Sequence, residues 1–175
     1  MVMDQLVAHA TGGMRAFDRD GRMASQGRPN RELLDRLLHA PWFRQKPPKT
    51  AGREQYGAAF VSELLATGFG IPDLLATAAA FTAASIALAI RDYAPGTEEI
   101  IAAGGGVHNS LLMAQLAAFA PLCRVTTTAE FGIDPDAKEA IAFAVLAART
   151  WRREPGNLPS ATGARHPVIL GKLTR

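Results

Sequence analysis

The sequence predicts a helix-rich α/β chain, and two stretches carry that prediction. Residues 98–109 contain a short apolar run with β-branched residues that is followed at once by three glycines. A run of this kind is typical of a strand that is covered on both faces. Residues 72–93 are apolar nearly all round and begin with Pro72, a residue favoured in the first turn of a helix. We expect this helix to be buried at the centre of the fold.

The three consecutive glycines Gly104, Gly105 and Gly106, called the glycine turn below, join the predicted strand to a helix. Glycine has no Cβ and tolerates positive φ, so a ligand can lie directly against main chain there. Asn109 is a good N-cap, and the helix behind it presents free N–H groups to the turn. This pattern is typical of an anion or nucleotide site, although glycines that only make the corner are the commoner explanation. A dinucleotide fingerprint is discounted because Asn109 stands where its third glycine belongs.

Several further elements are predicted from periodicity, proline and capping residues. They are a helix over residues 4–10, a helix introduced by Pro29 with Leu33, Leu34, Leu37 and Leu38 on one stripe, a helix marked by Tyr56, Phe60 and Leu64 that Gly68 ends, a strand over residues 123–127, a helix with Asp134 as N-cap and Pro135 in its first turn, and an extended segment over residues 167–171. Residues 46–54 connect two helices. Their basic side chains could contact phosphate, but a rigid exposed connector is the commoner role.

Composition excludes several classes of function. A chain of 175 residues has the length of one domain, and a net charge of +3 with few aromatic residues argues against nucleic-acid binding. Cys123 has no internal disulfide partner and is expected to be a buried, inert thiol. No secretory signal is predicted, and the uncharged stretch 74–90 is too short and too rich in alanine, threonine and serine to favour a membrane span. The four histidines are scattered. We therefore expect a cytoplasmic protein with no structural metal.

Glu139 lies one turn into the helix that Asp134 begins, on the stripe of Ala142, Phe143 and Leu146. A carboxylate at the N-terminal end of an otherwise apolar stripe either stabilises the helix dipole or belongs to a functional site. From the sequence alone, the dipole role is the commoner one.

Four segments together carry a resemblance to a known family. They are residues 47–54 (PPKTAGRE), 104–109 (GGGVHN), 132–140 (GIDPDAKEA) and 156–164 (GNLPSATGA). In this order and spacing they resemble the C-terminal portion of anhydro-N-acetylmuramic acid kinase, a bacterial sugar kinase with the actin/hexokinase-like (ribonuclease H-like) ATPase fold. The glycine motif alone is shared with many sugar kinases of that fold, whereas the combination is specific.

The resemblance implies that residues 1–175 form the second, C-terminal lobe of a two-lobed kinase, on its adenosine-binding side, truncated at the N-terminus. The family's nucleotide-binding positions fall on Gly104, Gly105, Gly106 and Asn109. Glu139 would bind the sugar. The cofactors would be ATP and Mg²⁺, and the reaction would convert 1,6-anhydro-N-acetylmuramic acid and water to N-acetylmuramic acid 6-phosphate in peptidoglycan recycling.

The family's phosphate loops and its catalytic aspartate lie upstream of the matching residues. The aspartate belongs to an Asp-Thr-Gly-Pro-Gly-Asn segment. The resemblance therefore assigns no catalytic residue to this chain, and the chain alone is expected to be inactive. The expected partners are the small-molecule sugar, ATP and the missing N-terminal lobe, with a homodimer left open and no membrane or nucleic acid. Two alternatives remain: a non-catalytic nucleotide-binding fragment, and another carbohydrate kinase of the same fold.

Overall fold

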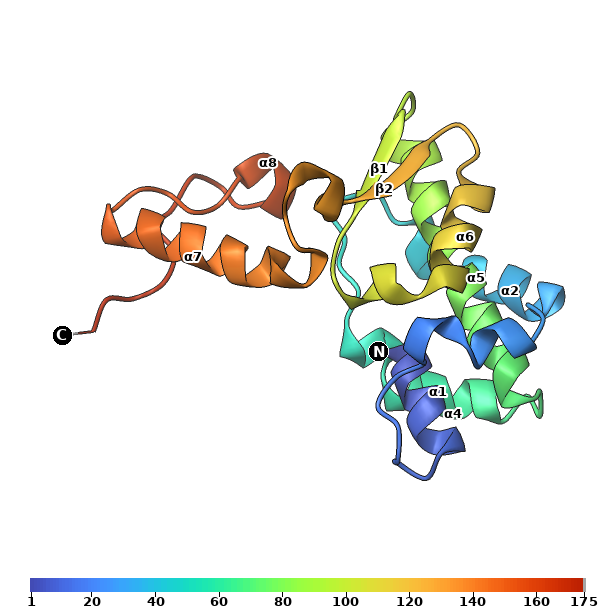
Figure 1. The fold of residues 1–175 in the computed structure, drawn as a ribbon. Helices are drawn as coiled ribbons and strands as arrows, with labels where there is room; N and C mark the ends of the chain where they lie inside the picture. The colour runs from blue at the N-terminus through green and yellow to red at the C-terminus, as the bar shows by residue number, and fades with distance from the viewer. Residues whose placement is uncertain (175) are drawn as a thin grey trace.

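The computed structural model describes residues 1–174. Figure 1 shows a body built from the first eight helices and strands and an arm, residues 138–174, that extends away from it. The helices and strands, in chain order, are α1 (Val2–Ala10), α2 (Arg31–Leu38), α3 (Arg53–Tyr56), α4 (Ala58–Leu65), α5 (Ile71–Tyr93), β1 (Glu99–Ala102), α6 (Ser110–Phe119), β2 (Arg124–Thr127), α7 (Lys138–Trp151) and α8 (Pro159–Thr162). Short 3₁₀ turns connect several of them. The predicted helix-rich α/β class is confirmed.

The core of the body is organised around α5, which contacts α1, α2, α4 and α6. Leu74 and Leu75 in its first half are almost completely buried and pack with Leu6 and Val7 of α1. The predicted central burial is confirmed for this half, whereas Ile86 in the second half is exposed. By length and composition α5 could cross a bilayer, but 56% of its apolar window is buried inside the molecule. A buried helix of a globular core accounts for that pattern.

Replacing Leu75 with alanine should cost about 2–5 kcal/mol of unfolding free energy, because it removes buried methyl groups and leaves a cavity among close-packed neighbours. The matched control is Leu122→Ala at a side chain that is 91% exposed, where the change should stay within about 0.5 kcal/mol. Urea unfolding followed by circular dichroism measures both values. Equal unfolding midpoints for the two variants would contradict the assignment of α5 as the centre of the core.

The two predicted strands are confirmed and form a parallel pair, with Ile100 opposite Val125 and Ile101 opposite Thr126. The helix α6 makes the crossover between them and packs against α5. The expectation that the first strand is covered on both faces is wrong, because Ile101 is 48% exposed. Apolar composition alone does not reveal which faces of a strand have neighbours.

The helix predicted around Tyr56, Phe60 and Leu64 is divided into α3 and α4 at Gly57. A Cβ at Gly57 would lie 2.1 Å from the carbonyl oxygen of Arg53, so the chain turns there in a way that only glycine permits. The helix also ends before Gly68, at Leu65.

The arm folds mainly on itself. The Gly156 N–H donates to the Val168 carbonyl oxygen (3.0 Å), and the Thr150 hydroxyl donates to the Leu170 carbonyl oxygen (2.5 Å). The predicted extended segment at 167–171 therefore runs back along α7 without joining a strand. No residue of α7 is buried, and Phe143 is 71% exposed.

Candidate functional site

The glycine turn leaves β1 and enters α6 through a 3₁₀ turn at Gly105–His108. Gly104 has φ +85°, a conformation that side-chain-bearing residues rarely adopt. The predicted N-cap is confirmed, because the Leu112 N–H donates to the Asn109 Oδ1 (3.0 Å). Nothing lies within 4 Å of a Cβ built on Gly104 or Gly105, so the main chain of the turn faces open space.

That open space belongs to a cleft of about 1130 Å³. Gly105, Gly106 and Asn109 line it, whereas Gly104 and Glu139 do not. Most of the other lining groups come from α1, the Ala16–Asp20 segment, the Trp42–Phe43 pair, α3, α4 and α5. The structure therefore brings three of the five residues assigned by resemblance to one cavity.

The segment of residues 18–21 forms a polar wall beside the start of α6. Asp18 is buried, and its two carboxylate oxygens accept hydrogen bonds from the N–H groups of Met23 (2.8 Å) and Ala24 (2.9 Å). The Ser110 hydroxyl donates to the Asp20 carbonyl oxygen (2.9 Å), which fixes this segment to α6. The sequence predicted no site residue here, because the aspartates become site residues only when this segment is brought against Ser110.

An aromatic wall closes another side of the cleft. Phe81 of α5 lies between Phe43 and Tyr56, with ring centroids 5.6 Å and 5.9 Å away, and Phe60 is 6.3 Å from Phe81. Burial raises the pKa of the Tyr56 hydroxyl above its ordinary value. The helical spacing of Tyr56 and Phe60 predicted an apolar stripe, but not that this stripe would line the site.

Lys49 is the basic residue of segment 46–54 that packs against the aromatic wall. Its ammonium lies 4.2 Å from the centroid of the Trp42 ring and donates to the carbonyl oxygens of Trp42 and Phe43 (3.3 Å each). The Trp42 Nε1–H in turn donates to the Thr50 carbonyl oxygen (2.8 Å). Because Lys49 makes these internal contacts, it serves the connector rather than a phosphate.

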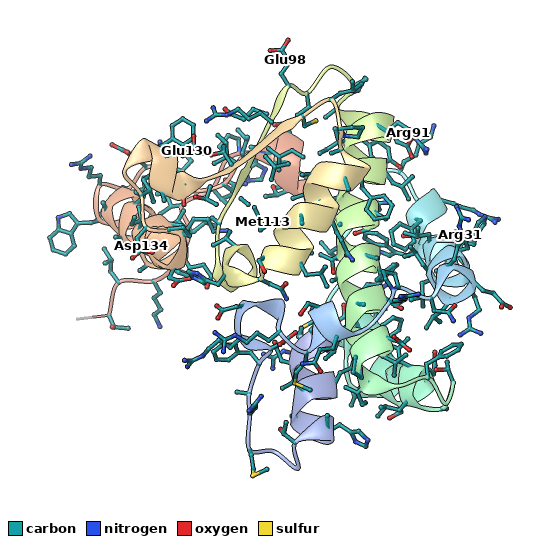
Figure 2. The ribbon with its side chains drawn as sticks, turned by 45° about the vertical axis from the view of Figure 1, so that its right-hand side comes forward. Arg31, Arg91, Glu98, Met113, Glu130 and Asp134 are labelled. Carbon is teal, nitrogen blue, oxygen red and sulfur yellow. The ribbon has the colours of Figure 1, made fainter. Side chains whose placement is uncertain are left out.

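The start of α7 lies against the glycine turn. The Gly104 N–H donates to the Pro135 carbonyl oxygen (2.9 Å), and His108 Nε2 lies 3.1 and 2.9 Å from the two carboxylate oxygens of Asp136. A 3₁₀ turn, Pro135–Ala137, leads into α7, and Asp134 caps it, as predicted, by accepting a hydrogen bond from the Asp136 N–H (2.9 Å). Figure 2 shows Asp134 beside α7. Both His108 and Asp136 line the cleft. Glu139 is exposed and follows Asp136 by three residues.

Comparisons with known proteins agree on one family. The model of the anhydro-N-acetylmuramic acid kinase family matches residues 1–175. The anhydro-N-acetylmuramic acid kinase of Thiobacillus denitrificans is 45% identical over 99% of this chain and 47% of its own length. Those of Caldanaerobacter subterraneus subsp. tengcongensis and Cyanothece sp. are 39% and 40% identical over 99% and 98% of this chain.

The chain spans about half the length of these curated relatives, since it covers 46–47% of each of them. The match to the family model nevertheless covers this whole sequence, from residue 1 to residue 175. The chain therefore belongs to the anhydro-N-acetylmuramic acid kinase family.

Proposed function

We propose that this chain is the adenosine-binding part of an ATP-dependent kinase that converts 1,6-anhydro-N-acetylmuramic acid and water to N-acetylmuramic acid 6-phosphate. The observation that carries the proposal is the open glycine turn on the wall of a large cleft, in a chain of this family. The reaction opens the anhydro ring with water while O6 receives the γ-phosphoryl group of ATP. Its place would be the cytoplasm, in the recycling of peptidoglycan.

The residues at the turn fit a nucleotide. Gly105 and Gly106 present main chain to the cleft, and Asn109 holds the first turn of α6 with its N–H groups directed toward the same region. Adenosine can therefore approach within van der Waals distance of the backbone, while the helix end favours negative charge nearby. The aromatic wall would exclude water from the contact between adenosine and the backbone.

Magnesium would arrive with the phosphates. Among residues 1–174 no group of three histidine, cysteine, aspartate or glutamate side chains is placed to hold a metal ion. Mg²⁺ in kinases is commonly bound by one or two carboxylates together with substrate phosphates and water. The described part of the chain fits that arrangement better than an all-protein metal site, and the ion would supply charge neutralisation during transfer.

Glu139 is proposed to contact the sugar. Residues three apart at a helix start lie on nearly the same face, so Glu139 follows the direction of Asp136, which lines the cleft. Its exposure leaves the carboxylate free to bind a hydroxyl or amide of a ligand held at the cleft rim. The remaining parts of the site, namely both phosphate loops and the carboxylate that activates water, would come from a first lobe.

Replacing Gly105 with valine tests the nucleotide site. The substitution meets no atom within 4 Å and no positive φ, so it should leave the fold intact while placing a branched side chain where the ligand must approach. We expect ADP affinity to fall about tenfold, which corresponds to roughly 1.4 kcal/mol. Calorimetric titration of ADP measures this in the chain fused to the non-matching half of the Thiobacillus denitrificans relative.

The control is Gly70→Val, at a glycine outside the cleft where a Cβ makes only ordinary contacts at 3.9 Å and φ is −61°. This variant should bind ADP normally. Equal ADP affinity for the Gly105→Val and Gly70→Val proteins would show that the glycine turn does not contact the nucleotide.

A further inference from the structure

The junction between the arm and the body has few contacts that could set the direction of α7. The apolar residues Ile141, Phe143 and Val145 are exposed, so their packing does not hold α7 against the body. A Cβ at Gly163 would lie 3.3 Å from the Pro48 side chain, which places the residue that ends α8 beside the connector. The base of the arm is held by a different set of contacts, at the glycine turn.

Two links join the glycine turn to the 3₁₀ turn Pro135–Ala137 that leads into α7. One is the main-chain hydrogen bond from Gly104 to Pro135 (2.9 Å). The other joins His108 Nε2 to both carboxylate oxygens of Asp136, across 28 residues of sequence. The Asp136 main chain is itself fixed by the Asp134 carboxylate. Asp136 therefore connects the 3₁₀ turn that leads into α7 to His108, which follows the last glycine of the glycine turn by two residues.

We propose that His108 and Asp136 are a positioning pair that fixes the first turn of α7, and with it Glu139, at a constant angle to the glycine turn. The contact of His108 Nε2 with both carboxylate oxygens holds the imidazole ring beside the Asp136 carboxylate. The pair acts on the reaction only through Glu139, so its effect on turnover rests on the proposed function. Its effect on the arm does not.

The first experiment measures the arm in the 175-residue chain. Spin labels are attached to cysteines introduced at Glu63 on α4 and Ala148 on α7 in a Cys123→Ser background, and electron paramagnetic resonance gives the distribution of distances between them. His108→Ala and Asp136→Ala should each broaden the distribution. His108→Gln, whose amide can still donate to the carboxylate, should restore it. The control His39→Ala should change nothing, since His39 bonds only within its own helix region.

Hydrogen exchange provides an independent reading in the same variants. The Gly104 amide should exchange roughly two- to fivefold faster in His108→Ala, as expected for the loss of an exposed side-chain pair next to its own hydrogen bond. Unchanged label distances together with an unchanged Gly104 exchange rate would overturn the positioning pair.

Kinetics then connect the pair to catalysis in the chain fused to the other half of a relative. His108→Ala should raise the KM for the sugar or lower kcat while leaving ADP affinity unchanged, and His108→Gln should recover the loss. A mobile arm with unaltered kinetics would overturn the coupling to Glu139. If the unsubstituted fusion showed no kinase activity at all, the proposed function would fail while the label distances still decided the pair.

Discussion

Incubated with ATP, Mg²⁺ and 1,6-anhydro-N-acetylmuramic acid, the 175-residue chain alone is expected to form sugar 6-phosphate at least about a thousandfold more slowly than a full-length relative. Phosphoryl transfer depends on groups that position the γ-phosphoryl group and neutralise its charge, and on a carboxylate in line to activate water. Under the proposed function, the cleft residues described here would provide the adenosine side. Of the cleft-lining carboxylates, Asp18 accepts from two main-chain N–H groups and Asp136 contacts His108, so both already have structural partners within the chain.

Phosphorus-31 NMR of the reaction mixture measures the product directly. Supplying the half of a relative that carries the Asp-Thr-Gly-Pro-Gly-Asn segment, fused or in trans, should restore product formation. The same half incubated without this chain is the control and should be inactive. Sugar 6-phosphate formed at an ordinary enzymatic rate by the 175-residue chain alone would refute the proposal that its site is incomplete.

Glu139→Gln in the fused protein should lower turnover roughly ten- to a hundredfold, the cost of losing a hydrogen bond to a charged group in the transition state. Glutamine keeps the size of the side chain and its helix propensity, so the fold should be preserved. If Glu139 only stabilises the dipole of α7, the variant should lose less than about 1 kcal/mol of unfolding free energy and turn over normally. Steady-state kinetics and urea unfolding of the same preparation separate these two results.

The matched control is Glu32→Gln, because Glu32 also stands in the first turn of a helix, at the start of α2. It does not line the cleft and should show only the small stability loss of a dipole partner. Normal turnover in both variants would leave Glu139 with the structural role alone.

Local signals in the sequence predicted much of the fold. Asn109 was recognisable as a helix start because an N-cap acts on its own next three residues, and it caps α6 as expected. Gly57 divides a predicted helix because the Arg53 carbonyl oxygen approaches it closely, and the spacing of apolar residues does not reveal such an approach. Likewise, the exposure of Ile101 depends on which elements lie over the sheet, and the residues next to it in the sequence do not determine those elements.

The site was predictable in part for the same reason. The glycine turn is a continuous stretch, so its three glycines and Asn109 could be read directly. The Asp18 wall, the aromatic wall and the pairing of His108 with Asp136 each join residues that are distant in sequence. Glu139 was selected by motif, and the structure leaves it three residues from the nearest cleft-lining carboxylate on its own segment.

The small parallel sheet bears on how this chain can be joined to other polypeptide. Within residues 1–174, β1 and β2 pair only with each other, so each strand has an outer edge whose N–H and C=O groups have no strand partner. Two strands of four residues are fewer than an independently stable sheet needs. An added strand at either edge would form main-chain hydrogen bonds, which do not depend on the identity of its side chains. Backbone geometry at these edges can therefore guide assembly even where the sequence of the added strand varies.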